Sequence, residues 1–287
     1  MRRISGLAAA GALAALLLTA ATGSASPLGH QTPPPTPTPT PAPAPAPNPC
    51  DNPLEELRCP DLVMSPPSHL TLDRRTERGH VLLRATSSVD NHGTGPLELR
   101  GHRRSSRSMR VTQIIYRRNG TRAFFPSKAL LGFKFVSGRR YGFTYPNFSY
   151  WKFRGAARFQ LWSVDSQNKA IKLVRFGPKL FYCFRDLQRT HPSAASPKGA
   201  VYPACSQNPN QRTVTLGTSV GWSDIYPYTY AEQYIDVTGL RGRFAYVQVA
   251  DPFNRIVEAR ENNNFSEVYV QLPSGRVLGE RHGVSTP

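Results

Sequence analysis

The feature that most constrains this fold is a series of short segments that alternate apolar and polar residues between turn-forming sequences. Ala157–Val164 alternates in this way and is followed by the turn sequence Asp-Ser-Gln-Asn and by a second segment, Ala170–Val174. Arg110–Tyr116 is rich in β-branched residues and leads into Asn119-Gly120, a strong hairpin signal. No segment longer than about ten residues has clean helical periodicity. We therefore predict an all-β fold, an antiparallel β-sandwich with long loops and little helix.

Other strands are expected from the same pattern. Val89–Leu99 has two strand-like ends around an Asn/Gly/Pro turn, which predicts a hairpin. Gly217–Tyr226 is expected to be a glycine-bordered loop that runs on toward a short strand. The remaining expected strands are Pro60–Val63, His80–Thr86, Tyr234–Val237, Phe244–Val249, Ile256–Val257 and Glu267–Leu272.

The ends of the chain differ in composition from this β-rich part. Arg2 and Arg3 precede an apolar, alanine-rich run and small residues suited to cleavage, which predicts a signal peptide over residues 1–25. Residues 26–49 are dominated by proline and predict a disordered, extended linker. The folded domain is expected over residues 50–273, followed by a flexible tail over 274–287. The protein is therefore expected to be secreted or associated with the cell wall, with no membrane span after signal cleavage.

The chain is strongly basic, with 36 Lys and Arg against 18 Asp and Glu. Basic residues cluster in 101–107, 117–118 and 139–140. Such clusters attract polyanions, and an exported chain without a nucleic-acid module favours an anionic cell-envelope polymer or an acidic protein surface over nucleic acid. The alternative is a solvated, arginine-rich surface with no specific partner.

Four cysteines are present, and an exported protein is expected to oxidise them. Four cysteines allow three pairings. We favour the sequence-local one, Cys50 with Cys59 and Cys183 with Cys205. Neither pair has the spacing of a redox or zinc site, so structural disulfides are expected.

Several segments together resemble the lysyl oxidase family, in particular its shorter bacterial members. They are Asn91-x-Gly93-x-Gly95 with Leu97-Glu-Leu99, Lys179-Leu-Phe-Tyr-Cys183-Phe-Arg-Asp186, Gly221-Trp-Ser-Asp-Ile-Tyr226 followed by Gln233-x-Ile-Asp236, and Asp251-Pro-Phe-Asn with Glu258 and Asn262-Asn-Asn264. The resemblance covers roughly residues 60–272, nearly the whole folded part. It implies a β-sandwich with long loops.

In active members the family oxidises primary amines to aldehydes and releases ammonia and hydrogen peroxide, using copper and a lysine tyrosylquinone. The resemblance places the two quinone precursors at Lys179 and Tyr226 and makes Asp224 a candidate base. A quinone carbonyl forms a Schiff base with the amine and then serves as an electron sink. Both precursors are present in this chain.

The resemblance fails at the copper ligands. Active members carry a His-x-His-x-His cluster, whose imidazoles share one face of an extended strand. Phe148, Tyr150 and Lys152 occupy these positions here. The histidines of the folded part are His69, His80, His92, His102 and His191. None forms an alternating or i,i+4 pair, so any replacement cluster would have to be assembled by the fold.

The sequence therefore favours a catalytically silent, lysyl oxidase-like binding domain of the cell envelope, with no cofactor expected. The Lys152 ammonium is expected to stand where copper would be and to offset the charge of Asp224. The alternative is an active amine oxidase with an altered metal site, which would need copper and the quinone. A third interpretation is an unrelated β-sandwich adhesion domain, which predicts that Lys179 and Tyr226 lie far apart.

Overall fold

The computed structural model of the protein describes residues 47–144 and 146–282. About half of the described residues lie in β-strands, and the sheets are antiparallel. The described residues contain one short 3-10 turn, η1 (Pro49–Asp51), and no α-helix. The predicted all-β fold is therefore confirmed. The predicted signal peptide (1–25) and all but the last three residues of the predicted linker (26–49) lie outside the described residues.

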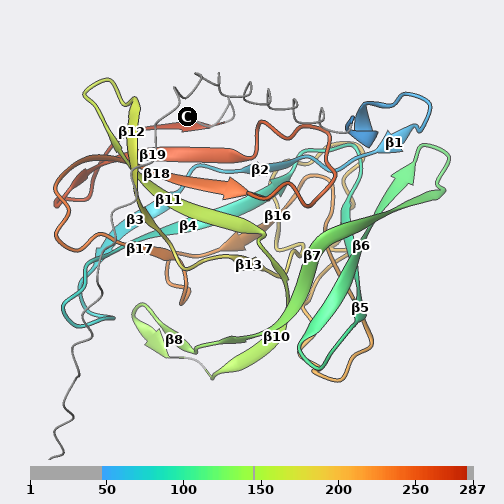
Figure 1. The fold of residues 1–287 in the computed structure, drawn as a ribbon, viewed down its shortest axis with the longest axis horizontal. Helices are drawn as coiled ribbons and strands as arrows, with labels where there is room; N and C mark the ends of the chain where they lie inside the picture. The colour runs from blue at the N-terminus through green and yellow to red at the C-terminus, as the bar shows by residue number, and fades with distance from the viewer. Residues whose placement is uncertain (1–46, 145, 283–287) are drawn as a thin grey trace, which may run out of the picture. The chain divides into compact units, whose positions relative to one another are not determined.

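The longest strand, β7, lies in a seven-stranded sheet that also contains Phe148–Lys152, the segment where the resemblance predicts copper ligands. Its order is β13-β10-β7-β6-β5-β15, with β1 paired to β6. Figure 1 shows this sheet curling from β5 through β7 into β10. Its strands are β1 (Leu57–Arg58), β5 (Leu97–Arg103), β6 (Ser108–Arg117), β7 (Arg122–Val136), β10 (Phe148–Arg154), β13 (Phe181–Tyr182) and β15 (Thr213–Thr218).

Two further sheets and a small hairpin complete the fold. A five-stranded sheet has the order β12-β11-β18-β19-β20, and a six-stranded sheet has the order β14-β16-β4-β17 with β2 and β3 also paired to β4. The strands are β2 (Leu62–Met64), β3 (Ser68–Asp73), β4 (Leu82–Asn91), β8 (Arg139–Arg140), β9 (Phe143–Thr144), β11 (Ala157–Val164), β12 (Ala170–Phe176), β14 (Gln188–Arg189), β16 (Trp222–Tyr226), β17 (Tyr234–Asp236), β18 (Gly242–Ala250), β19 (Phe265–Leu272) and β20 (Arg276–His282).

One hydrophobic core joins the three larger sheets. Leu131 from β7, Leu83 from β4 and Phe159 from β11 all belong to it and are fully buried. A smaller cluster packs around the opposite face of the five-stranded sheet; it comprises Val164, Ala245, Val247, Val249, Phe265 and Tyr269. Because β18 has buried side chains on both faces, this part of the molecule forms a rigid base for the loops.

Several predicted strands are confirmed. β11 has the predicted bounds and pairs with β12 across the predicted turn. β6 and β7 form the hairpin expected around Asn119-Gly120, where Gly120 has φ of 84°. This left-handed conformation is one that glycine adopts without steric cost. The strands that alternation defined most clearly are thus the ones predicted most accurately.

The predicted hairpin at Val89–Leu99 is wrong, because the chain changes sheets there. β4 lies in the six-stranded sheet and β5 in the seven-stranded sheet, and the two do not pair. A Cβ atom at Gly93 would clash with the carbonyl oxygen of Cys59, and one at Gly95 with that of Arg58. These glycines therefore let the crossover pack directly on the entry segment.

Three other predictions need correction. The expected loop Gly217–Tyr226 contains a strand, β16, because its residues pair with β4. Ile256–Val257 is not a strand; the N–H of Val257 instead donates to the side chain of Gln113 at 2.7 Å. The expected flexible tail from 274 is wrong for Arg276–His282, which pair with β19 as strand β20.

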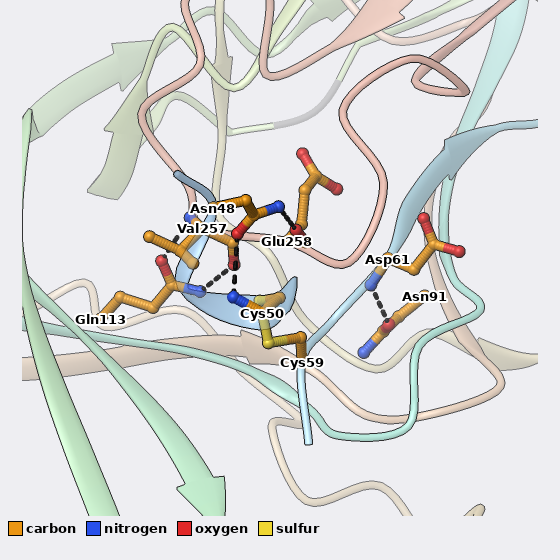
Figure 2. Close-up of a disulfide and its surroundings, with 8 residues drawn as sticks. All are labelled: Asn48, Cys50, Cys59, Asp61, Asn91, Gln113, Val257 and Glu258. Carbon is orange, nitrogen blue, oxygen red and sulfur yellow. Dashed lines mark hydrogen bonds between the residues drawn. A yellow bond between two sulfur atoms is a disulfide. The ribbon is translucent and has the colours of Figure 1, made fainter. Parts of the chain in front are cut away.

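Both predicted disulfides are formed, Cys50–Cys59 and Cys183–Cys205. Figure 2 shows the first of them beside the Asn48 side chain, which donates to the carbonyl oxygen of Glu258 at 2.7 Å. The disulfide ties Cys50 to Cys59, and the hydrogen bond of Asn48 joins this start of the domain to a segment near its end. Among the described residues, no helix has the length and apolar character needed to cross a membrane.

Candidate functional site

Lys179 and Tyr226, predicted to be the two quinone precursors, lie in contact. Lys179 belongs to the loop between β12 and β13, and Tyr226 ends β16. The Lys179 Nζ atom lies 3.7 Å from the centroid of the Tyr226 ring. The two residues are 1% and 6% exposed. The fold therefore brings together side chains that are far apart in the sequence and removes both from solvent.

A glycine close to Lys179 fixes the path of its loop. The N–H of Gly177 donates to the carbonyl oxygen of Phe159 at 3.0 Å. A Cβ atom at this position would lie 2.6 Å from the carbonyl oxygen of Tyr234. Only glycine allows the loop to pass this close to β17, and the passage delivers Lys179 to the interior.

Strand pairing fixes Tyr226 and Asp224 on one face of β16. Asp224 pairs with Val89 and Tyr226 with Ser87 of β4. Residues two apart on a strand share a face, so both side chains point into the core. The Tyr226 hydroxyl also accepts a hydrogen bond from the N–H of Cys183 at 3.2 Å. Asp224 is fully buried, and its carboxylate is therefore part of the same interior site.

Two further tyrosines, which the sequence did not single out, complete a cage around Lys179. The Nζ atom lies 4.5 Å from the ring centroid of Tyr230 and 4.7 Å from that of Tyr182. Both rings meet Tyr226 edge to face, at 5.2 Å and 4.5 Å between centroids. An ammonium held over several rings gains cation–π stabilisation when it is desolvated. The run Tyr226-Pro-Tyr-Thr-Tyr230 was the one local signal for Tyr230.

An anion also lies within reach of Lys179. Its Nζ atom is 3.9 Å from an Oε atom of Glu232. Glu232 precedes β17 and is partly exposed, with a side chain 21% accessible. The buried lysine is thus balanced by a carboxylate as well as by aromatic faces.

The segment Phe148–Lys152, where the resemblance predicts the copper ligands of active members, lines the same interior. Phe148, Tyr150 and Lys152 alternate along β10, and Lys152 is fully buried. The Lys152 Nζ atom donates to the Tyr230 hydroxyl at 3.4 Å and lies 4.6 Å from the Tyr150 ring centroid. The Tyr150 and Tyr230 hydroxyls are 2.6 Å apart. We refer to Tyr150, Lys152, Lys179, Tyr182, Asp224, Tyr226, Tyr230 and Glu232 as the lysine–tyrosine cluster.

Burial dominates the ionisation of the cluster. Desolvation raises the pKa of Asp224 to about 7, although Lys179, Arg185 and Lys152 oppose the shift. Desolvation lowers the pKa of Lys152 to about 8, against the opposing influence of Glu232 and Asp224. The pKa of Tyr226 is raised well above its usual value, first by burial and then by Asp224. Tyr226 is therefore a neutral phenol near neutral pH.

These residues do not fit a copper ion. Phe148 has no donor atom, and Lys152 presents an ammonium to the tyrosines around it. Tyr150 would have to ionise to become a good ligand, but burial raises its pKa to about 12. Cu(II) favours imidazole ligands in tetragonal arrangements. A buried cation at the last of these three positions repels the metal instead of binding it.

A cavity of about 280 Å³ opens beside the cluster. Its walls include Tyr150, Tyr226 and Tyr230 together with the disulfide-bonded Cys205. Arg185 also lines it. The cavity thus combines aromatic surface with a guanidinium group. Such a combination suits a ligand that has an anionic group and an apolar or planar portion.

No protein-family model matches the chain, and no curated protein matches it. The lysyl oxidase resemblance therefore depends on the order of its sequence motifs.

Proposed function

We propose that this chain is an exported, lysyl oxidase-like domain that binds anionic material of the cell envelope and does not oxidise amines. The observation that carries the proposal is the composition of the lysine–tyrosine cluster. Both quinone precursors meet in the core, but a buried lysine occupies the place expected for a copper-binding histidine. The third interpretation, an unrelated domain, predicted that Lys179 and Tyr226 lie far apart, and the distance of 3.7 Å speaks against it.

The approach of Lys179 to Tyr226 also supports an unmodified pair. The Nζ atom lies over the ring face, whereas a lysine–tyrosine crosslink joins the nitrogen to a carbon at the ring edge, in the ring plane. The neutral state of Tyr226 further disfavours oxidation of the ring, because a phenolate loses electrons more readily than a phenol. The pair therefore serves packing and electrostatic balance in this proposal.

The partner follows from charge. Arg104, Arg107 and Arg110 are exposed on the β5–β6 hairpin, and Arg185 lines the cavity. An excess of basic residues, 36 against 18 acidic ones, attracts polyanions over the whole surface. An anionic wall polymer or an acidic protein surface could bind both the exposed arginines of the hairpin and Arg185 in the cavity.

One experiment separates the silent domain from an amine oxidase. The protein is produced by export with copper present and compared with the triple variant Phe148→His, Tyr150→His, Lys152→His, which rebuilds the alternating ligand set. We expect no quinone staining and no peroxide release with a primary amine from the wild type. Peptide mass spectrometry should find Lys179 and Tyr226 uncrosslinked.

The triple variant provides the positive control. Binding of one more copper ion by this variant than by the wild type would support the view that only the ligands have been lost. A quinone band or amine-dependent peroxide from the wild type would instead establish the alternative, an amine oxidase with an altered metal site. That alternative draws support from the retained contact between Lys179 and Tyr226.

A further inference from the structure

The end of β4 and the loop after β14 bring two histidines and an aspartate together. Asp90 lies in β4, His92 follows the strand directly, and His191 lies just after β14. One potential ligand atom from each residue lies within 4.8 Å of the other two. The His191 Nε2 atom is 3.5 Å from an Oδ atom of Asp90, and the two imidazole rings are 4.4 Å apart between centroids. The fold has thus assembled a cluster that sequence spacing did not reveal.

Backbone hydrogen bonds fix both histidines. The N–H of His92 donates to the carbonyl oxygen of Asp61 at 2.8 Å, and the N–H of His191 to that of Gly221 at 3.1 Å. Asn91, the residue before His92, accepts the N–H of Asp61 on its side chain at 3.1 Å, as Figure 2 shows. The two imidazoles therefore extend from positions that are already ordered.

The carboxylate is held in place as well. The side chain of Asp90 is 3% exposed. Its two oxygens accept hydrogen bonds from the hydroxyls of Ser65 and Ser88, each at 2.5 Å. Hydrogen bonds of this kind orient a metal-binding carboxylate and tune its basicity. A carboxylate has about four lone-pair positions, so these two bonds leave room for a metal.

The basic and amide side chains nearby bind Asp61 and leave the Asp90 carboxylate free to bind a metal. The nearby carboxylate of Asp61 is engaged by the Arg260 guanidinium at 2.5 Å and by the Asn263 amide at 2.9 Å. The side chain of His191 is 50% exposed, and a surface hollow beside the cluster is lined by both histidines. A metal ion could enter from solvent and keep one open coordination position.

We propose that Asp90, His92 and His191 bind one divalent transition-metal ion, with zinc the expected occupant. Two imidazoles and one carboxylate are a donor set typical of zinc, whereas calcium and magnesium prefer oxygen ligands alone. Ligand atoms around a tetrahedral zinc ion lie about 3.3 Å apart when the bonds are about 2.0 Å long. The distance of 3.5 Å between His191 Nε2 and the Asp90 carboxylate is already close to this spacing, and both rings are exposed and free of the packing that would prevent their rotation.

This site is separate from the lysine–tyrosine cluster. Asp90 pairs with Ser223, whereas the adjacent pair is Val89 with Asp224. Successive side chains on a strand point to opposite faces, so Asp90 and Asp224 lie on opposite sides of the sheet. A metal at Asp90 does not contact Tyr226, and the inference stands whether or not the proposed function holds. A metal bound at this site would link the end of β4 to the loop that follows β14.

The test is zinc binding by the intact, tag-free protein. Calorimetry near neutral pH should give one site per chain, and zinc should raise the melting temperature. The double variant His92→Ala, His191→Ala should weaken binding at least tenfold and abolish the thermal shift. The matched control, His69→Ala with His102→Ala, removes two histidines outside the cluster and should bind as the wild type does.

Two further measurements sharpen the outcome. When cobalt(II) replaces zinc, the wild type should show the visible absorption bands that cobalt(II) has in a site of low symmetry. The double variant should not show these bands. Circular dichroism should show that the double variant is folded, because both rings are exposed. The absence of saturable zinc binding by the wild type, or equal binding by the double variant, would overturn the proposal.

Discussion

Asp224 and Lys152 are buried charges of opposite sign that depend on each other. Burial shifts the pKa of each group toward its neutral form; Lys179 opposes the shift of Asp224 more strongly than Lys152 does, and Glu232 opposes that of Lys152 more strongly than Asp224 does. Removing one partner of a buried pair of charges leaves the other charge uncompensated. This usually destabilises the protein by more than the intact pair had stabilised it. Removal of the Lys152 ammonium should therefore have an effect on stability that can be measured.

The variant Lys152→Met should unfold at a lower temperature than the wild type near pH 7.5, with a loss of about 1–3 kcal/mol of stability. Near pH 5, where Asp224 is protonated, the loss should be smaller. Lys128→Met, on the exposed part of β7, is the control for loss of a lysine. Equal melting temperatures for Lys152→Met and wild type would argue against a balancing role.

Asp224 should also give the protein a characteristic pH dependence. Its pKa in the folded state is about 7, above the ordinary value of 3.8. The folded state thus binds more protons between these values, so stability should fall as pH rises from about 4 to about 7. Each unit of pKa corresponds to about 1.4 kcal/mol. In urea unfolding at several pH values, Asp224→Asn should show a shallower fall than the wild type.

Other carboxyls contribute in the same direction, which makes the difference between variants the informative quantity. Burial raises the pKa of Asp251 to about 6 and that of Glu261 to about 7. Asp224→Asn should therefore reduce the pH dependence without removing it. An unchanged slope would mean that Asp224 ionises as freely in the folded protein as in the unfolded chain.

At the level of secondary-structure elements, the turn before β16 depends on one glycine. Gly221 has φ of 71°, and a Cβ atom there would clash with the carbonyl oxygen of His191 and the hydroxyl of Ser196. The turn thus holds the loop after β14 against the sheet. Both the conformation and the lack of space require glycine.

Gly221→Ala should therefore destabilise the protein more than Gly120→Ala. Gly120 has a similar φ of 84°, but no other atom lies within 4 Å of the position that a Cβ atom would take there. The control, Gly120→Ala, should lower the free energy of unfolding by about 1 kcal/mol through backbone strain alone. Gly221→Ala should lower it further, because neighbouring atoms must also move. Chemical denaturation of both variants measures the difference. Equal losses of stability would show that the loop after β14 moves away from the added methyl group without a measurable penalty.

The disulfides stabilise loops of different length, and their removal should differ accordingly. Cys183 and Cys205 are separated by 22 positions, whereas Cys50 and Cys59 are separated by 9. Loop-closure entropy predicts a loss of about 3 kcal/mol for the longer loop and somewhat less for the shorter. Thermal unfolding of the two double serine variants tests the order, and the reverse order would indicate that the native contacts, not loop length, dominate.

Sequence reasoning succeeded for elements whose pattern is local. β11, β12 and the β6–β7 hairpin follow from alternation and turn residues, and both disulfides follow from proximity in the sequence. It failed at Val89–Leu99 because the glycines there serve close packing and not a tight turn. Nothing in the local sequence distinguishes these two uses of glycine, since the neighbouring backbone comes from Arg58 and Cys59.

The candidate site shows the same division between local and distant information. Lys179, Tyr226 and Asp224 were identified through ordered motifs, and their meeting in space is consistent with that identification. Tyr182 and Tyr230 were missed because their role depends on which residues the fold places around Lys179. His191 was missed as a partner of Asp90 and His92 because about 100 positions separate it from them.

At the scale of the whole molecule, the net charge of +18 governs encounters with other molecules. Exposed Arg104, Arg107 and Arg110 concentrate part of this charge on one hairpin. Replacing all three by serine should weaken binding to immobilised polyglutamate by about tenfold at low salt, since such interactions are electrostatic and screened by ions.

The matched control removes the same charge from another hairpin. Lys169, Lys172 and Arg175 are exposed on and beside β12, and their replacement by serine lowers the net charge equally. A smaller effect from this triple variant would localise binding to the β5–β6 hairpin. Equal effects would instead favour a solvated basic surface without a specific partner.

The position of Cys205 in the cavity wall has a practical consequence for ligand discovery. The wall depends on a covalent bond that forms only in an oxidising compartment. Protein made in a reducing cytoplasm would present a different cavity, and compounds screened on it would be judged against the wrong receptor. Ligand searches should therefore begin from exported material whose thiols have been titrated and found absent.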